Sequence, residues 1–483
     1  MKKRQSISVV LFLGLTLGVG RAQDNSGQQP AGNDTQTRTE PAPAIGPGTG
    51  TINSDENPPI SGLDQPSLEP RAAARSFLLP GAVVSQSLDS NVGGSTSNSA
   101  IHGVTRAFGT LTLERLWSKY ATALDYVGGG GFYSGGDRKN TLIQELQAYQ
   151  RIAWRTGQLT IRDSFSYLPE GTFGYGTYGG AAGGYESGLP YAGPGSGISG
   201  GGFGAGGFFG AGQFGSLGQQ PRITNVVLAE AIEALSPRSS VTVAGAYSLN
   251  RFTDNTASLI NNRQTSAQAG YNYQLGRHDQ VGLLYGFQYF QYPELSVGDF
   301  TTHIVHLLYG HRISGRMDSL LGVGPQLVIR NSSVFGNSRT LSISGRGSLR
   351  YRLRRGEAIL SYSRLTTSGS GFFVGASSDV ARVSLAQPIS RQWDAVADVG
   401  YTHNRRILPG GGVTTANSYG YVYAGGAAHR RLGRYFVLFF SYQFNDLAFD
   451  SSFCGTTGPC NRTSQRHVAT VGLDWHPHPI RLD

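Results

Sequence analysis

Cysteine, methionine, charge and long apolar runs are all scarce in this sequence. Of its 483 residues, two are Cys and two are Met, and charged residues make up 14%. The one mainly apolar stretch, Ile7 to Val19, falls short of the roughly 18 consecutive apolar residues that a membrane helix needs. No cysteine directly follows that stretch, so a lipid anchor is not expected. If the chain crosses a membrane, we expect it to cross as β-strands.

The N-terminus has the pattern of a secretory signal peptide. Lys2, Lys3 and Arg4 precede the apolar stretch, and Gly20-Arg21-Ala22 is a small-x-small cleavage site. We therefore expect residues 1–22 to be a signal peptide that is cleaved near Ala22. Export removes nucleic acid as a partner, even though the formal net charge is +10.

Residues 23–75 are rich in Pro, Gly, Asn, Gln and Thr and have almost no apolar periodicity. This composition predicts a disordered segment, which would form a periplasmic tail. A segment that docks on peptidoglycan or on a partner protein is the alternative.

The rest of the chain, 76–483, is organised as long hairpins. Between residues 262 and 292, apolar and polar or small residues alternate on both sides of the turn Gly276-Arg277-His278-Asp279. Successive side chains of a strand point to opposite faces, so each strand has one apolar and one polar face. Equivalent turns place Arg238, Arg277, Arg316 and Arg355 at a constant step of 39 residues, and Arg391 and Arg434 follow. Propeller blades have a similar period, but each period here holds two long strands rather than four short ones.

The alternation predicts one weak and seventeen stronger strands. A single-chain bacterial barrel has an even number of strands and both chain ends on the periplasmic side. The weak first strand, at about 81–89, is therefore included, and the expected count is 18, with 16 as the alternative. The stronger strands are expected at about 102–117, 119–134, 140–155, 157–168, 222–235, 239–253, 263–275, 279–292, 300–313, 317–331, 338–353, 357–372, 378–389, 392–406, 417–431, 435–447 and 465–476.

The apolar faces of these strands are rich in Tyr, Phe, Leu and Val, as in the run from Phe436 to Phe444. A soluble sandwich would cover such a face with a second sheet, whereas a transmembrane barrel turns it to lipid and lines its interior with the polar face. Long strands, alternating short and long connections and the export signal favour an all-β, transmembrane, antiparallel up-and-down barrel. The low charge content and mildly negative mean hydropathy agree with it.

The last strand, Val468 to Trp475, resembles the closing strand of bacterial outer-membrane proteins, with a glycine and a late aromatic residue for the barrel-assembly machinery. It departs from that pattern because His476 to Asp483 extend past the last aromatic residue. The whole of 76–483 resembles the porin-like outer-membrane β-barrel superfamily, and no motif names a subfamily. The resemblance implies a Gram-negative outer membrane, with its lipid and its assembly machinery as partners.

Loop lengths predict the orientation of the barrel. Periplasmic turns are short and extracellular loops longer, so the arginine turns should be periplasmic and the Gly-rich connection 169–221 extracellular. That connection is either a flexible surface feature or an inward-folded constriction. Its Gly202, Gly204 and Gly207 match a dinucleotide-binding pattern by letters only, because the strand and helix that this pattern requires are missing. Cys454 and Cys460, in the last outward loop, are expected to form a disulfide.

Several charged residues are expected to point into the barrel. Arg330, Arg346, Arg350, Arg352 and Arg430 form a lumen-lining basic stripe, which either braces the wall through salt bridges or selects anions. The other inward charges on this parity are Glu145, Arg151, Asp394, Asp398 and Asp474.

No catalytic, metal or cofactor site is expected. His303, His306 and His311 share a strand, but only the first and last share a face, and roughly 27 Å of extended strand separates them. Asp398 and His403-Asn404 are the nearest candidates for a barrel hydrolase.

Barrels of 16 to 18 strands leave an aqueous channel unless they are plugged. We therefore expect a passive pore for polar, and from the basic stripe anionic, solutes. An exopolysaccharide export conduit and an occluded structural or adhesive surface barrel are the alternatives.

Overall fold

The computed structural model describes residues 59–61, 76–94, 100–135, 140–170, 219–253, 259–295, 298–331, 336–369, 371–408, 415–454 and 461–482. The chain divides into two compact units, 1–47 and 48–483, and all described residues belong to the second unit. No helix among them is long and apolar enough to cross a membrane.

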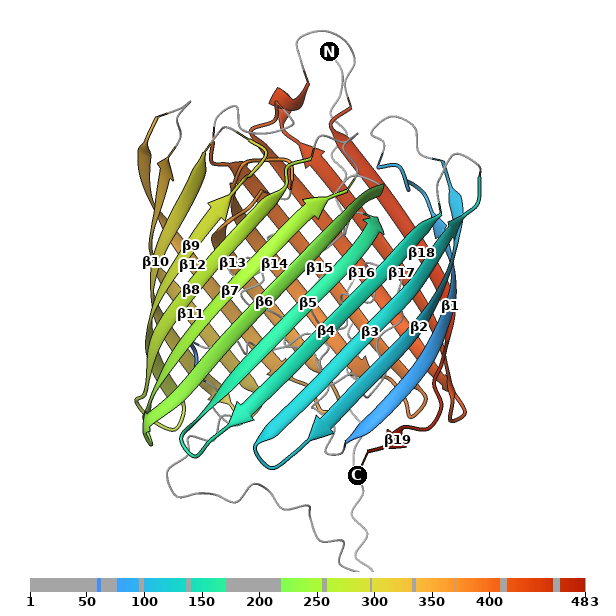
Figure 1. Cartoon of the computed structure of the whole chain (residues 1–483), viewed down its shortest axis with the longest axis horizontal. Helices are drawn as coiled ribbons and strands as arrows, with labels where there is room; N and C mark the ends of the chain where they lie inside the picture. The colour runs from blue at the N-terminus through green and yellow to red at the C-terminus, as the bar shows by residue number, and fades with distance from the viewer. Residues whose placement is uncertain are drawn as a thin grey trace, which may run out of the picture. The chain divides into compact units, whose positions relative to one another are not determined.

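The second unit consists of β-strands that each run antiparallel to the next (Figure 1). One short 3₁₀ helix, η2 (Ser451–Phe453), follows the seventeenth strand. The strands are β1 (Phe77–Asp89), β2 (His102–Leu116), β3 (Tyr120–Tyr133), β4 (Thr141–Ala153), β5 (Gly157–Glu170), β6 (Gln219–Ser236), β7 (Ser239–Phe252), β8 (Asn262–Gln274), β9 (Asp279–Gln291), β10 (Asp299–Ser314), β11 (Met317–Asn331), β12 (Ser338–Arg352), β13 (Glu357–Thr367), β14 (Ala376–Pro388), β15 (Trp393–Arg406), β16 (Ser418–Leu432), β17 (Phe436–Phe449), β18 (Thr463–Trp475) and β19 (Ile480–Arg481).

The sheet closes on itself because β1 pairs with both β2 and β18. Ser87 on β1 lies opposite Val104 on one side and opposite Thr470 on the other. The result is a closed antiparallel barrel of β1 to β18, as the sequence predicts. The two-residue β19 adds to the start of β1 through Phe77 and Leu78.

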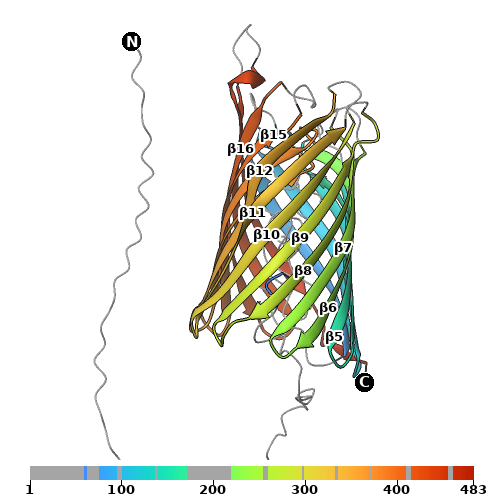
Figure 2. The ribbon, with the colours of Figure 1, turned by 90° about the vertical axis from the view of Figure 1, so that its left-hand side faces the viewer.

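Short and long connections separate to opposite rims of the barrel (Figure 2). The short turns follow the even-numbered strands, and the starts of β1 and β19 lie at the same rim (Figure 1). The longer connections follow the odd-numbered strands. The prediction that the arginine turns share one rim, opposite the ends of the connection 169–221, is confirmed; these arginines are Arg238, Arg277, Arg316, Arg355, Arg391 and Arg434.

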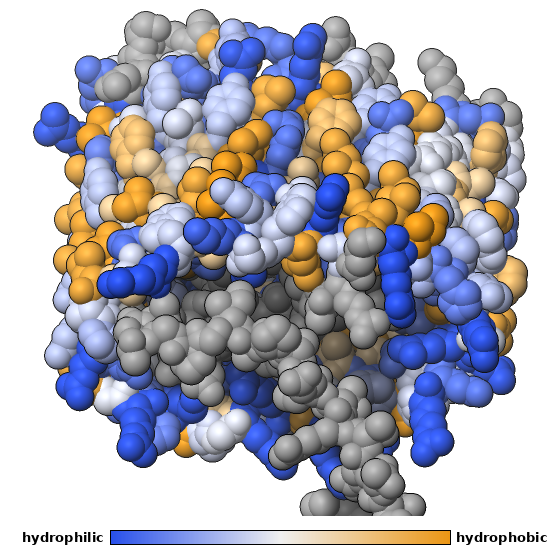
Figure 3. Space-filling model, turned by 60° about the horizontal axis from the view of Figure 1, so that its bottom comes forward, coloured by the Kyte–Doolittle hydropathy of each residue, from blue (hydrophilic) through white to orange (hydrophobic). Residues whose placement is uncertain are grey.

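The wall has the polarity of a membrane barrel. Large apolar side chains on its outer face are exposed, as for Leu341 at 72% and Ile343 at 69%, whereas inward polar side chains such as Asn250 and Gln288 are fully buried. Figure 3 shows apolar side chains over the outer wall and hydrophilic ones gathered at the rim of the short turns. A soluble protein rarely exposes so large an apolar surface, and lipid is the solvent that stabilises it.

The observed strand bounds lie close to the predicted ones, with one clear difference. The strand predicted at 357–372 ends at Thr367. Gly369 and Gly371 have φ angles of 87° and 82°, in the left-handed region that breaks an extended strand. The chain from Ser368 onward therefore turns away from the wall.

Candidate functional site

The interior face of the barrel follows from the register. Neighbouring residues in the ladder share a face, so the inward positions of one strand fix those of the next. Arg350 on β12 lies opposite Asp318 on β11, and Arg346 lies opposite Gly322. Arg330 on β11 and Arg352 on β12 share the parity of these inward positions.

Two of these four inward arginines are neutralised by carboxylates. Arg350 forms an ion pair with Glu357 at the start of β13. The Nη2 of Arg352 lies 3.3 Å from Oδ2 of Asp318. Both pairs lie near the short-turn rim, where they brace β11, β12 and β13 against one another.

The other two inward arginines contact backbone carbonyls. The Nη1 of Arg330 donates to the carbonyl of Ile407 at 2.7 Å, and the Nη2 of Arg346 donates to the carbonyl of Ile60 at 2.9 Å. A carbonyl satisfies a guanidinium hydrogen bond without neutralising its charge. Among the described residues, these two arginines are therefore the members of the predicted basic stripe whose charge no carboxylate neutralises.

Arg430 does not lie on the inward face, contrary to its predicted position. It pairs in the ladder with the outward Trp393, and its guanidinium carbon lies 5.5 Å above the centroid of that ring. The inward positions of β16 are instead the odd-numbered ones, which include its buried tyrosines and His429. Arg430 lies two residues from the end of β16, and near the membrane edge an outward arginine costs only about 0–1 kcal/mol.

The remaining charges predicted to face inward do so by register. Asp398 accepts a hydrogen bond from Nε of Arg382 at 2.7 Å, and Asp394 lies 3.7 Å from Nη2 of Arg431. The interior therefore carries cross-strand ion pairs as well as isolated cations. This set comprises Glu145, Arg151, Asp394, Asp398 and Asp474.

The connection between β13 and β14 folds into the barrel at the long-connection rim. Gly371 accepts a hydrogen bond from the backbone N–H of Ile260, which precedes β8, and Gly375 accepts one from Ile407, which follows β15. The hydroxyl of Tyr292 donates to the carbonyl of Ser368 at 3.0 Å. Since β8 and β15 lie on either side of β13 and β14, this connection reaches across the mouth of the barrel.

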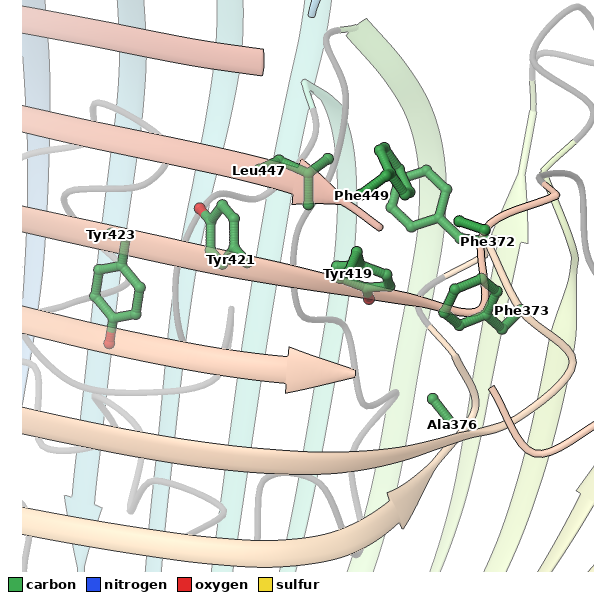
Figure 4. Close-up of a cluster of buried hydrophobic side chains, with 9 residues drawn as sticks. Phe372, Phe373, Ala376, Tyr419, Tyr421, Tyr423, Leu447 and Phe449 are labelled. Atoms are coloured by element: carbon green, nitrogen blue, oxygen red, sulfur yellow. The ribbon is translucent and has the colours of Figure 1, made fainter. Parts of the chain in front are cut away.

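An aromatic cluster holds this inward connection in place (Figure 4). The ring of Phe372 meets Tyr419 on β16 and Phe449 on β17 edge-on, with centroid distances of 5.5 and 5.6 Å. Tyr421 and Tyr423 continue the inward aromatic row along β16. Burial raises the pKa of Tyr292 well above its usual value, so its hydroxyl remains a neutral donor to the connection. The long-connection end of the lumen is thus narrowed by apolar side chains.

A short N-terminal piece also lies inside the wall. Pro59–Ser61 fall within the range predicted as a periplasmic tail, and Ser61 is fully buried against side chains of β7 and β8. The sequence offered no periodic signal for these three residues. Most of the predicted tail and the predicted signal peptide lie outside the described residues.

The residues weighed for catalysis or metal binding do not come together. Asp398 and Asn404 face inward, whereas His403, one position from Asn404, faces outward. His306 points inward to Ser344, and His303 packs on outward Tyr285 and Phe287. Within the described ranges no group of His, Cys, Asp or Glu could hold a metal ion.

Two predictions about the long connections fall on residues that the structure leaves undescribed. Cys460 lies outside the described residues, so the Cys454–Cys460 disulfide stays a prediction. The same holds for the path of the Gly-rich connection, of which only the ends at 169–170 and 219–221 are described.

No protein-family model matches the chain, and no curated protein matches it in sequence. Among solved structures it is similar to OccK2 (OpdF) of Pseudomonas aeruginosa in complex with glucuronate, with 9% identity, a TM-score of 0.40, and coverage of 86% of this chain and 100% of that one. A BenF-like porin from Pseudomonas fluorescens Pf-5 has 8% sequence identity and a TM-score of 0.41, with coverage of 84% of this chain and 99% of that one. The ferric-catecholate import receptor Fiu of E. coli has 9% sequence identity and a TM-score of 0.39, with coverage of 84% of this chain and 82% of that one.

These similarities are too low to carry an inference about solute or partner, so the assignment rests on the wall itself. An antiparallel ladder of β1 to β18 closes through β1 and β18, its outer face is apolar, and its inner face is polar and charged. An apolar outer face and a polar inner face are the polarity of a membrane barrel. The chain has the architecture of a closed, antiparallel up-and-down β-barrel of the membrane-spanning type.

Proposed function

We propose that this protein is an outer-membrane channel for the passive passage of small polar solutes, with a preference for anions. The observation that carries the preference is the pair Arg330 and Arg346, two inward cations whose partners among the described residues are carbonyl and hydroxyl oxygens. Arginines that line a pore are the usual device for anion selection.

The burial of the inner wall supports a path along part of the lumen. Inward side chains of β4, such as Gln147 and Arg151, are half-buried, and so are Arg346 and Ser348 on β12 and Ser363 on β13. Most inward side chains of β7 to β10, away from the short-turn rim, are fully buried by comparison. A solute would therefore pass over the half-buried sectors, and one of these carries Arg346.

Fewer arginines support the anion preference than the sequence suggested. Arg350 and Arg352 have acidic partners, and Arg430 lies outside the barrel. Charges in water at about 0.15 M salt interact over roughly 8 Å, so Arg330 and Arg346 act on solutes close to them rather than across the whole bore.

Planar-bilayer recordings under a salt gradient test this function. The wild type should give a reversal potential that favours anions. Replacing Arg330 and Arg346 together by Ser should lower the anion-to-cation permeability ratio severalfold, because a unit charge at about 4 Å in water contributes on the order of 1 kcal/mol.

Two matched variants serve as controls. Arg430→Ser removes an arginine from the outer face, and the double variant Arg350→Ser/Glu357→Ser removes an ion pair without changing the net charge. Both should keep the wild-type selectivity. Cation selectivity in the wild type, or an unchanged ratio in the Arg330/Arg346 variant, contradicts the anion preference.

An occluded barrel with a structural or adhesive role is the second candidate. The inward-folded connection between β13 and β14 and the burial of the inner face of β7 to β10 favour it. If neither the wild type nor any variant conducts, the structural or adhesive role is favoured over the pore. Export of a polysaccharide has no comparable support in the wall.

A further inference from the structure

Pro59–Ser61 make a dense set of hydrogen bonds to the inner wall. The backbone N–H of Ser61 donates to Oδ1 of Asn272 at 2.9 Å, and Nδ2 of Asn272 donates back to Oγ of Ser61 at 2.7 Å. Nε2 of Gln268 donates to the Ser61 carbonyl at 2.6 Å, and the hydroxyls of Ser61 and Thr242 lie 2.5 Å apart. Every polar group of Ser61 is thus satisfied by β7 and β8.

The contact continues through Ile60 to a second sector of the wall. Its carbonyl accepts the hydrogen bond from Arg346 on β12. The segment therefore joins β7 and β8 to β12 across the inner surface of the intervening strands. It also occupies the guanidinium of Arg346, one of the two stripe arginines with no carboxylate partner among the described residues.

Glycines on three adjacent strands leave the room that this segment fills. A Cβ at Gly270 on β8 would lie 2.4 Å from the side chain of Ser61, and one at Gly310 on β10 would lie 2.9 Å from Ile60. A Cβ at Gly282 on β9 would lie 3.3 Å from Ile60. At Gly310 no other atom comes closer than 3.9 Å, so the space there is set by Ile60 alone.

The position of this pocket fits a segment that enters from the short-turn rim. Thr242 lies near the start of β7, which follows the short turn from β6, and Asn272 lies near the end of β8, which precedes the short turn to β9. Ser76, directly before β1, is held at the same rim by its hydroxyl, which accepts from the N–H of Leu116. The chain between Ser61 and Ser76 is about 15 residues long and could extend up to roughly 50 Å, so its length permits both docking and release.

We propose that Pro59–Ser61 form a tethered plug, which closes the passage by occupying a pocket in the inner wall and which leaves Arg346 open to an anionic solute when it undocks. The inference rests on the proposed channel function. Docking and an anion compete for the same guanidinium, so the Ile60 carbonyl stands where a solute oxygen would bind. Hydrogen bonds to two amide side chains, Asn272 and Gln268, and the glycine pocket give the plug its fixed register.

Disulfide locking tests the plug in the full chain. The variant Ser61→Cys/Thr242→Cys, in a Cys454→Ser/Cys460→Ser background, places two thiols where the hydroxyls now touch. Ile60→Cys/Gly310→Cys supplies a second pair at a different point of the pocket. The oxidised proteins should crosslink and stay closed in bilayer recordings, and a reductant should raise the open fraction at least tenfold, while the cysteine-free parent does not respond.

A milder variant weakens docking without any crosslink. Asn272→Ala removes two hydrogen bonds to Ser61, each worth on the order of 1 kcal/mol, and should raise the ratio of undocked to docked segment by roughly tenfold or more. Asn262→Ala is the matched control, since Asn262 is an inward asparagine of the same strand with no hydrogen bond to the segment. It should leave the open fraction unchanged.

The outcomes separate the plug from the channel. If neither cysteine pair crosslinks, Pro59–Ser61 does not dock on the inner wall as proposed. If the pairs crosslink but locked and reduced proteins conduct equally, the plug is wrong and the channel stands. If the pairs crosslink and no variant conducts even after reduction, the channel itself is wrong and the plug has nothing to close.

Discussion

At the scale of single residues, a deeply buried ion pair lies where the barrel closes. Nε of Arg466 on β18 lies 2.9 Å from both carboxylate oxygens of Asp89 on β1, and the side chains are 4% and 0% exposed. The same carboxylate accepts from the backbone N–H of Asn91. A buried pair need not stabilise a protein more than an apolar pair would, but breaking it leaves one charge without a partner.

We expect Asp89→Asn to weaken the β1–β18 seam by about 3–5 kcal/mol, because Arg466 would remain buried and charged. Heat-modifiable migration on gels measures the effect, and the folded band should disappear at a lower temperature than in the wild type. Asp394→Asn is the control, because its pair with Arg431 is about half exposed and worth about 0–1 kcal/mol. Equal loss in both variants would mean that the seam does not depend on this pair.

At the scale of elements, the sequence predicted the strand bounds well, but it did not predict which side of β16 faces inward or how side chains pair between strands. Alternation is a local signal, so it gave the bounds of strands such as β8 and β9 within a residue or two. It failed for β16, whose tyrosines face inward because they pack on the connection between β13 and β14. No local sequence pattern predicts that this connection folds into the barrel. It also could not pair Arg350 with Glu357, since that contact depends on how the side chains at the β12–β13 turn lie, beyond the strand register.

The inward connection between β13 and β14 should depend on Gly371. Alanine there would adopt a left-handed φ of 82° and bring its Cβ within 2.7 Å of the ring of Phe252. The backbone term alone costs about 1–2 kcal/mol, and the clash adds to it, so Gly371→Ala should detach the connection from the mouth. Protease cleavage at 368–375 should become faster and the open-channel conductance larger.

Gly433→Ala is the matched control for that prediction. Its φ is 76°, so the backbone term is similar, but no atom lies within 4 Å of the added Cβ. It lies in the short turn between β16 and β17, far from the inward connection along both strands. If it changes conductance as much as Gly371→Ala does, backbone strain rather than the lost packing at the mouth explains the effect.

At the scale of the whole barrel, its two ends are narrowed by different chemistry. The long-connection end holds an aromatic cluster around Phe372, and the short-turn half holds the hydrogen-bonded segment Pro59–Ser61. A polar solute or salt has little effect on the stability of apolar packing. By contrast, a polar solute can compete with Pro59–Ser61 for the hydrogen bonds of Asn272 and Arg346. The short-turn half is thus the end where a solute can act on the passage.

The orientation of the barrel decides which side of the membrane meets each end. Short turns face the periplasm in barrels of this kind, so the long connections should face the cell exterior.

Single cysteines in a Cys454→Ser/Cys460→Ser background report this orientation on whole cells treated with a membrane-impermeant thiol reagent. Ile101→Cys is at a long-connection end and 74% exposed, and Gly315→Cys is in a short turn with no atom within 4 Å of its Cβ. We expect label at position 101 on intact cells, and label at position 315 only after the outer membrane is permeabilised. The reverse pattern would invert the barrel, and a solute from outside would then meet Pro59–Ser61 before it met the aromatic mouth.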